Sequence, residues 1–108
     1  MRTILSATLV VVVLLAAVLL FAADAAKGKQ VYMTRCAACH DRDGKGKEAI
    51  GKMFKVTMKP LGSKEVQAAK DQRLQEVILK GTGKMPPVAI APQEAADVVA
   101  FLRTLAAK

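Results

Sequence analysis

The chain has 108 residues, enough for one domain at most, and its formal net charge of +8 comes from 17 Lys and Arg against 9 Asp and Glu. It holds no Trp, two Cys and one His. These numbers argue against a closed zinc site of four Cys or His ligands, and the absence of a βαβ pattern argues against a thioredoxin-like dithiol. A domain this small buries little surface and needs a disulfide, a metal or a cofactor to support its core.

Residues 1–25 are interpreted as an export signal. Residues 4–23 are almost wholly apolar and follow Arg2, and Ala23-Asp24-Ala25 forms a small-x-small cleavage pattern. The unbroken apolar run from Leu9 to Ala23 has 15 residues, which suits a long signal peptide, whereas the run from Ile4 has 20, enough for an uncleaved membrane anchor. We favour cleavage after Ala25, which leaves residues 26–108 as the domain. In both cases the domain is exported to the periplasm, soluble after cleavage or tethered to the membrane through residues 4–23.

The first half of the exported part predicts helices joined by long loops. Spacings of three and four residues predict a first helix from about Ala26 to Cys39. The stretch DRDGKGKEAIGK is rich in Gly and charge and is typical of a loop. A turn at Pro60-Leu61-Gly62 precedes Ser63, which is expected to cap a short helical piece through Ala69.

The second half predicts two longer helices around a stiff loop. Asp71 is expected to cap a helix whose inward face holds Leu74, Val77 and Ile78, and which ends at Gly81. KGTGKMPPVAIA is expected to be a loop. Pro92 suits the first turn of a last helix with Glu94 near its positive end. Apolar side chains follow in this helix at positions 0, 3, 4 and 7, namely Val98, Phe101, Leu102 and Leu105. The prediction is an all-α domain whose long loops wrap around something.

The segment CAACH, residues 36–40, holds both cysteines and the single histidine of the chain. A disulfide between Cys36 and Cys39 would close a very small loop and constrain little of the unfolded chain. This spacing is instead the pattern of c-type haem attachment. Two thiols on one side of a helix end form thioethers with the haem vinyl groups, and His40 reaches the iron from one face. We therefore expect one covalently attached haem c.

Four methionines after the leader are candidates for the second iron ligand. A thioether opposite His is a common choice on a c-type iron. Met33 precedes Cys36 on the same helix and is poorly placed for the opposite face. Met53 and Met58 lie in an amphipathic stretch and suit core packing. Met85 is favoured because Pro86 holds it in an extended conformation after a flexible Gly81-Thr82-Gly83 turn, with Met58 and then Met53 as alternatives.

In order along the chain, these segments resemble class I monohaem cytochromes c, and the protein is similar to small bacterial types such as c6, c5 and c553. The resemblance covers residues 27–107 and rests on GKQVY before CAACH, DRDGKGK after it, LQEVILKG, GKMP and VVAFL. It implies a small helical domain wrapped around one haem, with Cys36 and Cys39 as thioether links and with His40 and Met85 as axial ligands. It also implies that the first and last helices cross at Gly28, with Tyr32 packed near Phe101.

Two parts of the chain depart from this family pattern. Phe101 stands where the family more often has Tyr or Trp, so a hydrogen bond from that position is expected to be missing. Residues 50–69 match no family feature apart from the turn at Pro60-Leu61-Gly62.

An iron with both axial positions filled disfavours substrate chemistry, so we expect an electron carrier and not an enzyme. The basic surface includes Lys52, Lys55, Lys59, Lys64, Lys80 and Lys84. It predicts docking to redox-partner proteins with an acidic face, and nucleic acid is excluded as a partner outside the cytoplasm. Two alternatives stay open: a haem subunit of a larger dehydrogenase or oxidase, and a gas-binding haem sensor if Met85 is not a ligand.

Overall fold

The computed structural model describes residues 8–12 and 22–107. Residues 8–12 form a short helical piece with exposed apolar side chains. Most of the predicted leader, residues 1–7 and 13–21, lies outside the described residues, so its role as cleaved signal or anchor stays a prediction. Across residues 8–12 and 22–107, no helix has the length and apolar character needed to cross a membrane.

The first predicted helix is two helices. Helix α2 spans Ala25–Arg35 and α3 spans Ala37–His40, with a break at Cys36. At the break the Cys36 backbone has φ −120° and its N–H still donates to the Tyr32 carbonyl at 2.8 Å. The prediction of a single helix to Cys39 was therefore wrong, because the chain changes direction at Cys36 and starts a new helical turn there.

Most of the long predicted loop after His40 is present, but its end is helical. Helix α4 spans Glu48–Phe54 and α5 spans Lys64–Ala68. Ser63 caps α5 as predicted, since its hydroxyl accepts a hydrogen bond from the Val66 N–H at 3.4 Å. The loop prediction for the KEAIGK part was wrong. Ile50, Met53 and Phe54 recur at helical spacing, but the glycines just before them favoured the prediction of a loop.

The last two helices follow the sequence closely. Helix α6 spans Asp71–Lys80 and ends at Gly81 as predicted. The prediction that Asp71 caps it was wrong by one residue, because Lys70 is the N-cap and Asp71 is the first helical residue. Helix α7 spans Pro92–Thr104, and Glu94 Oε1 accepts a hydrogen bond from the Ala91 N–H at 2.9 Å. No strand occurs in residues 22–107, where the nearest feature is an isolated bridge between Thr82 and Met85. The all-α prediction is confirmed.

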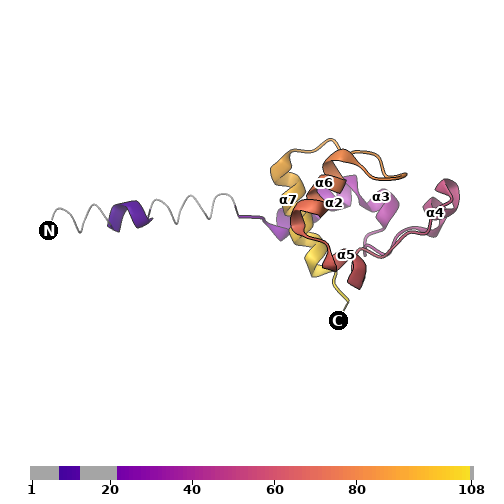
Figure 1. Cartoon of the computed structure of the whole chain (residues 1–108), viewed down its shortest axis with the longest axis horizontal. Coiled ribbons are helices and arrows are strands. Elements are labelled where there is room, and N and C mark those ends of the chain that lie inside the picture. The colour runs from indigo at the N-terminus through magenta and orange to yellow at the C-terminus, as the bar shows by residue number, and fades with distance from the viewer. Residues whose placement is uncertain (1–7, 13–21, 108) are drawn as a thin grey trace.

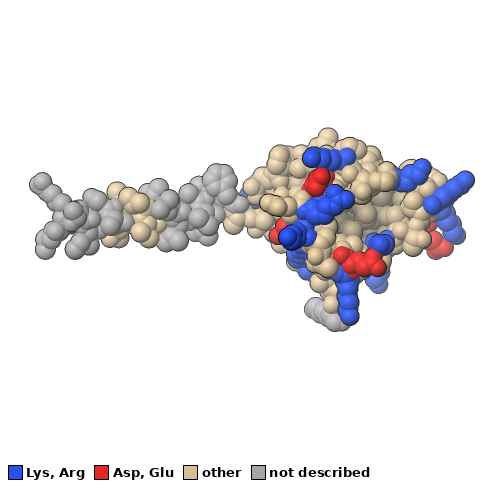
Figure 2. Space-filling model, in the orientation of Figure 1, with Lys and Arg blue, Asp and Glu red and all other residues tan. Residues whose placement is uncertain are grey.

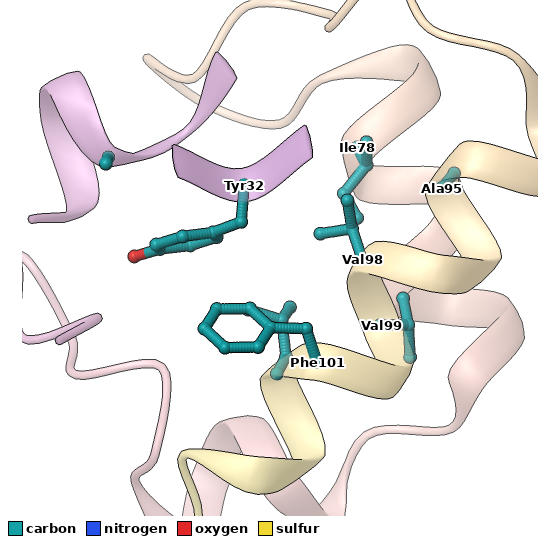
Figure 3. Packing of buried hydrophobic residues seen from close by; sticks show 8 residues of the cluster. Tyr32, Ile78, Ala95, Val98, Val99 and Phe101 are labelled. Atoms are coloured by element: carbon teal, nitrogen blue, oxygen red, sulfur yellow. The ribbon is translucent and has the colours of Figure 1, made fainter. Parts of the chain in front are cut away.

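Helices α2 and α7 cross and form the centre of the domain, and α6 packs on α7 (Figure 1). A Cβ placed on Gly28 would lie 1.8 Å from the Asp97 carbonyl oxygen, so only glycine permits this approach. The rings of Tyr32 and Phe101 pack against each other with centroids 5.0 Å apart and their planes inclined by 53° (Figure 3). The crossing and the aromatic contact confirm what the family resemblance implied. The buried core consists of Tyr32, Ala37, Ile78, Ala95, Val98, Val99, Phe101 and Leu102.

The short helix α5 is attached to α7 through Arg103 and through Gln67, whose Nε2 atom donates to the Leu102 carbonyl at 2.9 Å. The Arg103 guanidinium donates to the Gln67 carbonyl at 2.9 Å, to the Ala69 carbonyl at 2.7 Å and to Asp71 Oδ1 at 2.7 Å. These acceptors lie on the last turn of α5, on the link that follows and on the start of α6. Arg103 therefore sets how α5 and α6 lie against the last helix.

Candidate functional site

The CAACH segment forms a single helical turn that places its functional side chains together. The Cys39 and His40 N–H groups both donate to the Cys36 carbonyl, at 3.2 and 3.0 Å. Cys36 and Cys39 are three residues apart in this turn, so their thiols share one face. Both thiols are free and half-buried. The turn therefore offers two neighbouring sulfur atoms next to an imidazole.

The surroundings of His40 favour the uncharged form of its imidazole ring. Its carbonyl accepts a hydrogen bond from the Gly46 N–H at 2.8 Å, which closes the loop after it. Burial lowers the pKa of His40, so the neutral imidazole is the form present at neutral pH. Its Nδ1 atom is buried without a hydrogen-bond partner among the described residues. A neutral imidazole ring whose buried nitrogen has no hydrogen-bond partner is suited to be a metal ligand.

Two adjoining hollows meet at His40 and Met85. The inner hollow, about 70 Å³, is almost entirely apolar and is lined by Tyr32, Cys36, His40, Leu61, Val66, Leu74, Val77, Ile78, Met85, Val98 and Leu102. The outer hollow, about 290 Å³, is lined by Cys39, His40, Ile50, Phe54, Val56, Met58, Thr82, Lys84, Met85 and Pro86. Cys36 and Cys39 thus stand one at each hollow, while His40 and Met85 line both.

A tight hairpin holds Met85. The Thr82 N–H donates to the Met85 carbonyl at 3.0 Å, and the Met85 N–H donates to the Thr82 carbonyl at 2.9 Å. The backbone enters the hairpin at Gly81 with φ +77°, a conformation that favours glycine. A Cβ at this position would lie 2.7 Å from the Met85 carbonyl oxygen. Further along, the Val88 N–H donates to the Ile78 carbonyl at 2.8 Å and ties the loop to α6. The position of Met85 is therefore fixed on both sides by main-chain hydrogen bonds.

The structure separates Met85 from the other three methionines. Met53 has 68% of its surface exposed and lines neither hollow. Met33 packs against the core from α2 and also lines neither. Met58 lines the outer hollow alone, with its Cβ packed close to Gly46. Cys36, Cys39, His40 and Met85 are therefore brought together, and Met58 lies on the outer side of the same space.

Several wall residues had not been assigned from the sequence. Ile50, Phe54 and Val56 line the outer hollow, and Leu61 and Val66 line the inner one. All five come from residues 50–69, the stretch whose one recognised family feature is the turn that contains Leu61. The helical spacing of Ile50 and Phe54 was the available signal, and the glycines before them obscured it.

These residues fit a covalently held haem. One thiol stands at each hollow, a buried imidazole nitrogen lacks a partner among the described residues, a thioether lies on the wall shared by both hollows, and the remaining walls are mostly apolar. Thioether bonds from Cys with His and Met as iron ligands are the donor set of c-type haem proteins.

Comparison with known proteins gives the same class. The sequence model of the family "Cytochrome c" matches residues 25–106. The solved structure of the KustC0563 c-type cytochrome is similar, with a TM-score of 0.63 and 26% sequence identity over 74% of this chain and 98% of that one. No curated protein sequence matches. The chain belongs to the cytochrome c family, of class I. It is a haem-based electron carrier with covalently bound haem c. The c6, c5 or c553 subtype stays a prediction.

Proposed function

We propose that the protein carries single electrons outside the cytoplasmic membrane, with Cys36 and Cys39 as the thioether links and His40 and Met85 as the axial ligands. One observation supports this most directly: His40 and Met85 are the two residues that line both hollows, while one cysteine stands at each. A haem joined to both cysteines would be held by these two side chains, which line both hollows.

The chain's own residues keep such a site closed. Burial keeps the His40 imidazole neutral, so its lone pair is free to bind. The Thr82–Met85 hairpin holds the thioether in place, and the apolar inner wall keeps water away. When bound, haem supplies a one-electron Fe(III)/Fe(II) couple whose potential a thioether ligand raises. With both axial positions taken by the protein, no position is left for a substrate, which favours electron transfer over catalysis.

The surface supports a partner with an acidic face. The end of the domain that carries α4 shows a group of basic side chains, with few acidic ones among them (Figure 2). Lys45, Lys52 and Lys55 border a shallow hollow on α4, and Lys84 lines the outer hollow beside Met85. Because opposite charges attract, an acidic partner would approach this end of the molecule most readily. We place these encounters in the periplasm, in line with the export signal.

The test is a pair of spectra of the purified holoprotein, oxidised and reduced. A weak far-red sulfur-to-iron band in the oxidised protein, and no rapid binding of CO to the reduced protein, are expected for ligation by His40 and Met85. Haem that stays with the chain after acid-acetone extraction would establish the thioether links. Rapid CO binding without the far-red band would contradict the ligand pair and favour a gas-binding sensor.

A further inference from the structure

Asp24 is the first residue of the folded domain and makes contacts in three directions. Its Oδ1 atom accepts hydrogen bonds from the Ala26 and Lys27 N–H groups, at 2.9 and 3.1 Å, and so caps α2. Its carbonyl accepts from the Gly28 N–H at 2.9 Å. Its own N–H donates to Asp97 Oδ1 on α7 at 2.9 Å. A residue used in this way is part of the fold, although it lies inside the predicted cleavage pattern.

Asp97 is the acceptor of that last bond and is a buried carboxylate, with 5% of its surface exposed. Its Oδ1 atom accepts from the Asp24 N–H and from Gln93 Nε2 at 3.2 Å, both of which are uncharged donors. Among the ion pairs of residues 22–107, none includes Asp97. A buried charge is costly unless a charge of opposite sign accompanies it, and no cation of the described residues pairs with Asp97.

Hydrolysis of one peptide bond would supply this cation. If water is added across the Ala23–Asp24 bond, Ala23 gains a carboxylate and the nitrogen of Asp24 becomes an α-ammonium group. That nitrogen already lies 2.9 Å from Asp97 Oδ1. Ala23 supplies the small residue directly before the cut, whereas Phe21 stands two positions earlier, where the small-x-small pattern has a second small residue.

The cut that the sequence pattern favours, after Ala25, would have the opposite effect. It would remove the Asp24 carboxylate that caps α2, the acceptor of the Gly28 N–H and the donor to Asp97. Loss of a helix cap by itself lowers the stability of a helix. It would also leave Asp97 buried with fewer partners.

We propose that the mature protein begins at Asp24 and that its new α-ammonium group forms an ion pair with the buried Asp97. This assignment goes beyond electron transfer and rests only on the export signal being removed. The new terminus would lie at the crossing of α2 and α7, next to Gly28.

The first experiment is the intact mass and N-terminal sequence of the holoprotein purified from an exporting host. A start at Asp24 is expected. A start at Ala26, any other start, or a chain that keeps its leader would overturn the assignment. The haem spectrum of the same sample is read separately, so a failure of the proposed ligation is distinguishable from a failure of this inference.

The second experiment tests the charge pair itself. Asp97→Asn keeps the shape and an acceptor oxygen but removes the charge, and it should lower the thermal unfolding midpoint of the cleaved protein by several degrees. In an Ala23→Trp background, where a bulky residue blocks both cuts, the leader stays attached and the same Asp97→Asn change should cost little. Equal losses in the two backgrounds would overturn the ion pair.

The matched control for the charge is Asp43→Asn. Asp43 is exposed, and its Oδ1 atom likewise accepts a backbone hydrogen bond, from the Lys45 N–H at 3.0 Å. The control should change the unfolding midpoint equally little in both backgrounds. A background-dependent change at Asp43 as large as that at Asp97 would show that the leader acts on charge in general, which would also overturn the specific pair.

Discussion

The Tyr32 hydroxyl on α2 donates a hydrogen bond to the main-chain carbonyl of Asp41, with 2.5 Å between the two oxygen atoms. Asp41 follows His40 directly and has φ +64° and ψ 165°, a conformation that costs a non-glycine residue about 1–3 kcal/mol. The same carbonyl accepts from the Gly44 N–H at 3.2 Å. The first helix thus holds the strained backbone next to His40 in place through the Tyr32 hydroxyl. Phe101, the other ring of the pair, has no hydroxyl and cannot make such a bond.

Tyr32→Phe should leave the ring packing intact and loosen the chain after His40. We expect a folded, haem-bearing protein that is less stable by about 1–2 kcal/mol, because one buried hydrogen bond is lost. The His40 ring signals in the NMR spectrum should shift or broaden. Thr34→Val, which removes an exposed hydroxyl bonded to the Gln30 carbonyl, is the control and should change neither quantity appreciably. Identical spectra and stability for Tyr32→Phe and the wild type would contradict this role.

The same comparison has a pH dependence with a definite sign. Burial, together with nearby negative groups, raises the pKa of Tyr32 from 10.0 to about 12. Because the folded pKa lies above the unfolded one, the contribution of the hydroxyl is fully present below pH 10 and is lost as the pH rises through 12. The stability difference between wild type and Tyr32→Phe, measured by denaturant titration, should therefore be constant at neutral pH and shrink above pH 10.

Substitution of the methionines should identify the sulfur ligand. Met85→Ala should remove the far-red sulfur-to-iron band, lower the reduction potential and let the reduced iron bind CO, because the hairpin would then present no thioether. Met58→Leu and Met53→Leu should keep the band, since Met58 lies on the outer hollow alone and Met53 is 68% exposed. Loss of the band in Met58→Leu with its retention in Met85→Ala would reverse the assignment.

Gly28→Ala tests the crossing of α2 and α7. The added methyl group would overlap the Asp97 carbonyl, so the helices must separate, and we expect a loss of about 3 kcal/mol in the free energy of unfolding. Ala26→Gly, on an exposed position of the same helix, is the control and should cost about 1 kcal/mol or less through helix propensity. A crossing that tolerates Gly28→Ala as well as the control would mean that the helices do not approach as closely as the structure shows.

Arg103→Lys tests how α5 and α6 are attached to α7. The lysine cannot reproduce the fork that contacts Gln67, Ala69 and Asp71, so stability should fall by about 1–2 kcal/mol, a figure reduced by the partial exposure of the side chain. Arg73→Lys is the control, because its ion pair with Glu76 is exposed and should contribute less than about 0.5 kcal/mol. Equal effects of the two changes on urea unfolding would rule out the proposed attachment.

Charge reversal at Lys84 should slow encounters with an anionic partner. The second-order rate of oxidation by the trianion hexacyanoferrate(III) should fall more for Lys84→Glu than for Lys27→Glu, because Lys84 lines the outer hollow and Lys27 lies in the first turn of α2. The difference should fade as salt rises toward 0.15 M, where charges are screened over about 8 Å. Rates that are equal for both variants and flat with salt would leave these lysines as an ordinary solvated surface.

The sequence by itself determined the cofactor chemistry and the helical class. Cys36, Cys39 and His40 lie within one helical turn, so their spacing alone indicates haem attachment. The apolar stripes of α6 and α7 predict those helices for the same reason, since both signals are local. Ser63 as a cap and Gly81 as a stop were predictable for the same reason.

The tertiary structure decided what depends on distant segments. It placed Met85 where both hollows meet and Met58 on one of them, formed the outer wall from α4, and broke the first helix at Cys36. It also joined Asp24 to Asp97 across 73 positions of the chain. Such contacts leave no periodic trace, because each depends on how α2, α6 and α7 pack and not on the residues next to it in the sequence.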